Sequence, residues 1–242
     1  MRFILMKNRF KIIFLKQDLL SLTTIVLWFL SFLSGFSIIF SRSYLSGGFR
    51  VDNVYAMFSM FSNYLLIYMS VQLFGKEFNY RTINSIRICG RSHWEIIVRK
   101  LAVMLVLAIL TASLSFLTLL SDQLIFNQLE VNLLIVFGQL LLAYVTYSIF
   151  LFALGSLIIF LIKRTLHAFI TIFLILKIAI ALMNVLSSFE FTSYLINYIP
   201  LSFLEDAFSF ARYTPKQVIV TLIWSAIMLG VLSMLYRKRA YK

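Results

Sequence analysis

The sequence predicts an all-α membrane protein with six transmembrane helices. Hydrophobic residues make up 62% of the 242 residues, against about 45–50% in a typical soluble domain. Only 13% of residues are charged, and the mean hydropathy is +0.95. A soluble domain of this size could not cover so much apolar surface. The apolar stretches are continuous rather than alternating, which favours helices over a barrel. These observations exclude a soluble enzyme, a disordered chain, a fibrous protein and a disulfide scaffold.

Six apolar stretches have about the 20 residues that a helix needs to cross a bilayer. They are residues 19–40, 54–74, 101–120, 133–162, 166–186 and 217–236. The fourth has 30 residues, so we expect it to tilt strongly or to continue beyond the membrane. No Asp or Glu lies in any of the six, and Lys177 is their only charged residue.

Lys177 lies near the middle of the fifth stretch, where a charge is costly. We therefore expect it to face the interior of the bundle or the interface with a second chain. Asn184 follows seven residues later on the same helical face. The two residues are candidates for a translocation pathway. A lysine that only hydrogen-bonds neighbouring carbonyl groups explains the pattern equally well.

The basic residues predict the orientation of the chain. Seventeen lie in the N-terminal segment, the 76–100 connection, the 163–164 connection and the C-terminal tail, and four lie in the other connections. Because basic loops stay on the cytoplasmic side, both termini are expected in the cytoplasm. The net charge of +13 is then explained by orientation and contact with anionic lipid rather than by nucleic acid.

Two segments outside the six stretches are also apolar. Residues 3–17 mix basic and apolar side chains at helical spacing, which predicts an amphipathic helix in the membrane interface or an extension of the first span. Residues 187–216, between spans five and six, are rich in aromatic residues and are divided by Pro200. They predict a re-entrant outer segment, with an aromatic belt at the membrane surface as the alternative. Ser202 and Glu205 have the spacing of a capping box.

The sequence gives no sign of a catalytic or metal site. The two histidines, His93 and His167, are 74 residues apart, so they cannot form a helical metal pair. A phosphate-binding P-loop is absent. Cys89 and His93 are close enough to suggest a nucleophile and base, but an inert or palmitoylated cysteine is the simpler interpretation. We therefore predict no enzyme activity, metal or cofactor in this chain.

The connection at 76–92 carries the most informative pattern. Residues 76–89 are expected to extend the second helix into the cytoplasm, and Gly90 can end it in a left-handed conformation. Ser92 and Glu95 then form a capping box before the third span. The result is a basic elbow of two helical arms and a tight turn.

This segment resembles the type 2 ABC transporter permease family. The matching residues are Glu77, Arg81-Thr82, Gly90-Arg91-Ser92 and Lys100. Six spans, an interfacial N-terminal helix and a re-entrant segment before span six also fit that family, whose small members include permeases for peptide export and bacteriocin immunity. The family often has a proline in the turn, where this chain has Cys89-Gly90.

The resemblance implies a permease that exports an amphipathic peptide or a lipid-like molecule. It implies a separate cytoplasmic ABC ATPase subunit, which binds ATP and Mg, and a second permease chain, identical or different. The ATPase would dock on the elbow, whose residues are Glu77, Arg81, Thr82, Ile83, Ile86, Arg87, Gly90, Arg91 and Ser92. Its isoleucines would form the buried anchor and its arginines would meet acidic groups. The alternative function is a non-transporting membrane immunity or sensor protein that binds a peptide.

Overall fold

A computed structural model describes residues 21–44, 50–80, 93–126, 132–186, 188–189 and 195–238. These residues form seven α-helices and two short 3-10 helices, and no strand occurs among them. The α-helices are α2 (Leu22–Phe40), α3 (Val51–Asn79), α5 (His93–Phe126), α6 (Leu133–Ile162), α7 (Thr165–Leu186), α9 (Leu204–Ser209) and α10 (Pro215–Lys238). Six of them, all except α9, are long and apolar enough to cross a membrane.

The six predicted spans correspond to the six long helices, and two of these helices extend well beyond the predicted span at both ends. The helix α3 begins three residues earlier than the predicted span and ends five residues later, and α5 begins eight residues earlier and ends six later. The additional turns contain charged residues. A charged residue ends an apolar stretch, but the helical hydrogen bonds of the backbone continue past it, so the helix is longer than the stretch. The acidic residues of these two helices, Asp52, Glu77, Glu95 and Asp122, all lie in the turns outside the predicted spans.

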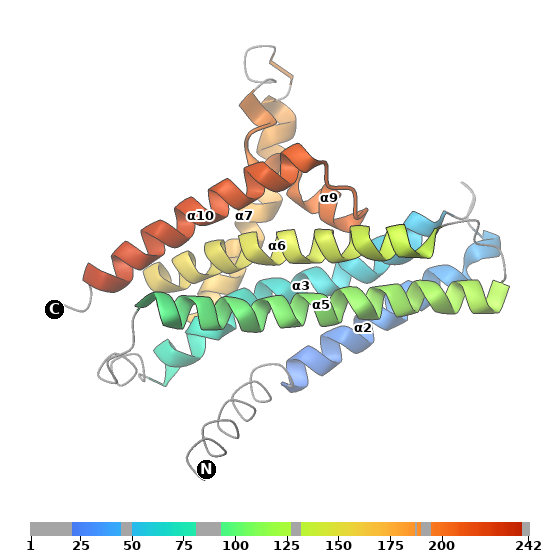
Figure 1. The fold of residues 1–242 in the computed structure, drawn as a ribbon, viewed down its shortest axis with the longest axis horizontal. Helices are drawn as coiled ribbons and strands as arrows, with labels where there is room; N and C mark the ends of the chain where they lie inside the picture. The colour runs from blue at the N-terminus through green and yellow to red at the C-terminus, as the bar shows by residue number, and fades with distance from the viewer. Residues whose placement is uncertain are drawn as a thin grey trace, which may run out of the picture.

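Three helices, α3, α5 and α6, lie side by side and form the centre of the molecule (Figure 1). The helix α2 packs on α3 and α5, and α10 packs on α6. Successive helices alternate in direction, so that the end of α3 meets the starts of both α5 and α7. The helix α7 is different, because it crosses the others steeply and its second half stands away from them (Figure 1).

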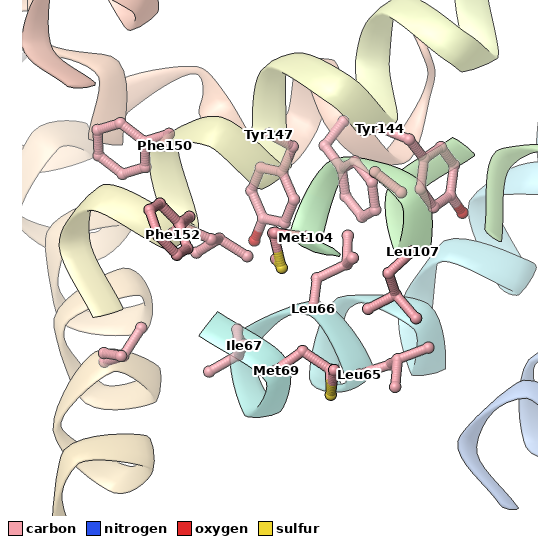
Figure 2. Packing of buried hydrophobic residues seen from close by; sticks show 14 of the residues in the cluster. Leu65, Leu66, Ile67, Met69, Met104, Leu107, Tyr144, Tyr147, Phe150 and Phe152 are labelled. Carbon is pink, nitrogen blue, oxygen red and sulfur yellow. The ribbon is translucent and has the colours of Figure 1, made fainter. Parts of the chain in front are cut away.

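The core consists of large apolar side chains from these three central helices (Figure 2). Leu66 of α3 points toward α5 and α6, whereas Met69 lies on the opposite side of α3, where its sulfur is 4.0 Å from Thr24 Oγ1 of α2. Tyr144 and Tyr147 of α6 point into the same layer, and both are fully buried. Buried tyrosines need partners for their hydroxyl groups, so the centre of this apolar core also has a polar requirement.

Small residues let the central helices approach closely. A methyl group on Gly155 of α6 would lie 2.4 Å from Oγ of Ser70 in α3. The same substitution at Gly35 of α2 would bring the methyl 2.8 Å from Thr118 of α5. Close backbone approach through small residues is the usual way in which helices pack in membranes, where no hydrophobic force drives them together.

Candidate functional site

A buried ion pair joins the end of α3 to the start of α5. Lys100 Nζ lies 2.6 Å from Glu77 Oε1, and the two side chains are 16% and 11% exposed. The same ammonium group donates a hydrogen bond to the carbonyl oxygen of Leu73 and lies 4.8 Å from the centre of the Phe74 ring. A buried pair of this kind is favourable only when further contacts satisfy both charges. Leu73 and Phe74 supply such contacts for the lysine.

This ion pair stands at the base of the predicted coupling elbow. Of the elbow residues, Glu77 lies in α3, whose last residue is Asn79, with Tyr80 as its C-cap. The predicted extension of the helix to residue 89 is therefore described only as far as Asn79. The remaining elbow residues lie outside the described part of the chain, namely Arg81, Thr82, Ile83, Ile86, Arg87, Gly90, Arg91 and Ser92. The N-terminal segment 3–17, predicted to be an interfacial helix, lies outside it as well.

A second ion pair involves the predicted pathway residue Lys177. Its ammonium group contacts Glu205 Oε1 of α9. The Lys177 side chain is 47% exposed, whereas that of Glu205 is 17% exposed. Lys177 is therefore not enclosed by its own chain but lies at the edge of the bundle with an acidic partner. Asn184 belongs to the same helix, and its side chain lies outside the described residues.

The predicted capping box of Ser202 and Glu205 is wrong, because neither side chain caps α9 in the structure. Ser202 Oγ donates to the carbonyl oxygens of Ile196 and Ile199, at 2.9 and 2.8 Å, instead of capping α9. The N-cap of α9 is Phe203, which makes no side-chain capping bond. Glu205 is then available to pair with Lys177. A charged residue within an apolar helix pairs with another charge or with backbone carbonyl groups, and in this structure Lys177 pairs with a carboxylate.

The helix α9 also packs an aromatic side chain against α6. The Phe208 ring stacks on Tyr147, with ring centres 4.1 Å apart, and contacts the edge of Tyr144 at 4.8 Å. Tyr147 donates to Asn63 Oδ1 over 2.6 Å, and the Tyr144 hydroxyl lies 2.9 Å from Ser62 Oγ. These bonds meet the polar requirement of the core and fix both tyrosine rings in place. The aromatic residues of α9 and α6 were not predicted to meet, because they are far apart in the sequence.

The N-terminal end of α3 contacts the segment that follows α9. Asp52 receives the guanidinium group of Arg212 and the hydroxyl of Tyr55, the latter over 2.6 Å. Asn63 is eleven residues further along α3 than Asp52, which is about 16 Å at helical rise. Phe208 therefore lies well inside the bundle although Arg212 lies at its end. Burial raises the pKa of the Tyr213 phenol, which stays protonated and donates to the Leu204 carbonyl oxygen over 3.1 Å.

The side-chain contacts described above hold the helices of the bundle together. Within the described residues, no group of three His, Cys, Asp or Glu side chains could hold a metal ion. The six helices that are long and apolar enough to cross a membrane indicate a multi-pass membrane protein. No protein-family model matches this sequence, and no curated protein matches it either.

Proposed function

We propose that this chain is the transmembrane permease subunit of an ATP-driven exporter of the type 2 ABC permease family. It would lie in the bacterial cytoplasmic membrane with both termini inside, and export an amphipathic peptide or a lipid-like molecule. A separate ATPase subunit would bind ATP and Mg and supply the energy. Two permease chains would form the pathway. The observation that carries this proposal is the buried ion pair between Glu77 and Lys100.

The ion pair matters because of its position on either side of the proposed elbow. Residues 81–92 connect the end of α3, two residues after Glu77, to the start of α5, seven residues before Lys100. A force applied to the elbow would therefore reach two helices that are fixed to each other at their bases. Both helices continue into the buried core, which also contains Tyr144 and Tyr147 of α6. This connection would link a cytoplasmic partner to the middle of the bundle.

The segment around α9 supports a pathway through the same bundle. We propose that residues 187–216 enter the membrane from the outer side and return. The depth of Phe208 supports this, since it contacts Tyr147 halfway along α6 while Arg212 pairs at the outer end of α3. The proposed interfacial helix at 3–17 would lie on the opposite surface.

Charge reversal at the elbow tests the proposal. The double variant Ile86→Asp with Arg87→Glu removes an apolar anchor and inverts a charge, and should release the ATPase subunit from the permease. The variant Lys163→Glu is the control, because it inverts an exposed charge on the same side of the bundle. Both proteins should insert normally, and only the first should lose the ATPase on purification from detergent. A double variant that keeps its ATPase and still exports contradicts the proposal.

Cysteine labelling tests the orientation separately. A membrane-impermeant reagent should label cysteines placed at Ser46 and Gln123 in intact cells, and should not label one placed at Ser92. Labelling of Ser92→Cys from outside would reverse the proposed topology. If the topology holds but the wild-type chain never co-purifies with an ATPase subunit, a membrane immunity or sensor protein that binds a peptide explains the fold instead.

A further inference from the structure

The helix α9 presents two side chains of different chemistry on one face. Glu205 and Phe208 are three residues apart, so they lie on the same side of a helix. Glu205 meets Lys177 of α7, and Phe208 meets Tyr144 and Tyr147 of α6. The helix therefore contacts the bundle much as a bound amphipathic peptide would, with an acidic group in one place and an aromatic ring in another.

The ion pair between Lys177 and Glu205 leaves one carboxylate oxygen without a hydrogen bond, and its lysine is exposed at the surface of the bundle. Lys177 is 47% exposed. Among the described residues, Glu205 Oε2 has no hydrogen-bond partner although it is buried. A buried carboxylate oxygen without a donor raises the free energy of the docked state. The ammonium group of Lys177 could therefore accept another carboxylate in exchange for that of Glu205.

The backbone directly after α9 is strained. Ala211 has φ 50°, in the left-handed region that normally requires glycine. The conformation lets Arg212 N donate to the Ala207 carbonyl oxygen over 2.9 Å and so end the helix. The contacts of Glu205 and Phe208 must outweigh this strain to keep α9 docked. A helix of only six residues with a strained end is easier to displace than one of the long helices.

We propose that Lys177, Tyr144 and Tyr147 form a binding site for an amphipathic peptide segment with an acidic and an aromatic side chain three positions apart. In the structure α9 occupies this site as an internal ligand. The inference rests on the proposed function, in which the exported molecule is amphipathic, and it specifies the chemistry of that molecule. The ammonium group would bind the carboxylate, and the two fixed tyrosine rings would hold the aromatic side chain.

A peptide with the sequence of residues 201–212 serves as the probe, because it contains the whole of α9. Its binding, with a fluorescent label, is measured by anisotropy against the full-length chain in lipid nanodiscs without any ATPase. The wild-type chain should bind it weakly, since α9 fills the site. The variants Phe208→Ala and Glu205→Gln weaken α9 and should bind the peptide about tenfold more tightly, as expected if one charged or aromatic contact no longer competes.

Three comparisons decide the outcome. A peptide with Gln and Ala in place of the acidic and aromatic residues should bind the two variants no more tightly than it binds the wild-type chain. The chain variant Lys177→Gln combined with Glu205→Gln should likewise show no increase in affinity for the original peptide. Phe29→Ala, which changes an exposed residue of α2, should bind as the wild type does.

If Phe208→Ala does not fold, Glu205→Gln has nearly the same shape as the wild-type chain and carries the test alone. Equal binding to wild type and variants, or to both peptides, overturns the proposal. Failure to capture an ATPase is a separate result, because this assay contains none.

Discussion

The two lysine–glutamate pairs have the same chemistry but opposite surroundings. The Glu77–Lys100 pair joins two helices of the packed centre, whereas Lys177–Glu205 joins a short helix to the edge of α7. In the most apolar part of α3, 67% of residues are buried within the chain, compared with 22% in α7. Burial, rather than the type of ion pair, therefore determines which one fixes the structure and which one can open.

The largest effect is expected when the buried pair is broken on one side. Lys100→Leu leaves Glu77 buried without its lysine, which should lower the free energy of unfolding by about 3–5 kcal/mol. Unfolding in detergent, followed by circular dichroism, measures the loss. The double variant Glu77→Leu with Lys100→Leu removes both charges and should recover most of it. If the single and double variants are equally unstable, the charge on Glu77 is not the cause.

Close packing of the centre should give the next largest effect. Gly155→Ala places a methyl group against Ser70 and should destabilise the chain by about 1–3 kcal/mol. Gly138→Ala in the same helix is the control, because its new methyl group meets nothing within 4 Å. That variant should be neutral or slightly stabilising, since alanine favours a helix. Equal melting temperatures for the two variants would contradict the close approach of α3 and α6.

A smaller change in stability is expected at the half-exposed pair. The double variant Lys177→Leu with Glu205→Gln removes both charges of this pair and should change the free energy of unfolding by less than about 1 kcal/mol. The protein should therefore reach normal levels in the membrane. Export should nevertheless decrease, because the proposed site loses its ammonium group. Full export activity at a normal expression level would show that Lys177 has only a structural role.

The smallest effect should have the opposite sign. Ala211→Gly relieves the left-handed strain after α9 and should stabilise the chain by up to about 1 kcal/mol. Ala226→Gly is the matched control, since this exposed residue lies within α10 and should lose about 0.5–1 kcal/mol. Thermal unfolding of both variants under the same conditions measures the difference. A loss of stability at both positions would mean that Ala211 is not strained.

The sequence was sufficient to predict the six long helices, because each is a continuous apolar stretch. The apolar stretches alone locate the ends of these helices less well. The base of α5 contains Glu95, Arg99 and Lys100, which end an apolar stretch but do not end a helix. The local signal is nearer, since the capping box expected at Ser92 and Glu95 stands directly before His93, the first residue of α5. Of the ion pair between α7 and α9, only the lysine was predicted as a site residue. Lys177 stands out in its apolar surroundings, whereas Glu205 is 28 residues away and had a local interpretation as a helix cap. Contacts between distant segments depend on packing, which spacing along the chain does not report.

The connection between α6 and α7 gives the molecule a mechanical property. Only two residues separate these helices, and the first, Lys163, has a left-handed conformation with φ 61°. The start of α7 is also clamped to α3, where Asn79 donates to Thr165 Oγ1 over 2.8 Å. With one end fixed and the other standing away from the bundle (Figure 1), α7 can act as a lever. For a helix about 33 Å long, a rotation of about 5° at this fulcrum would move the far end by about 3 Å. The fulcrum lies beside the base of the elbow, so a small displacement there would be amplified along the arm that carries Lys177.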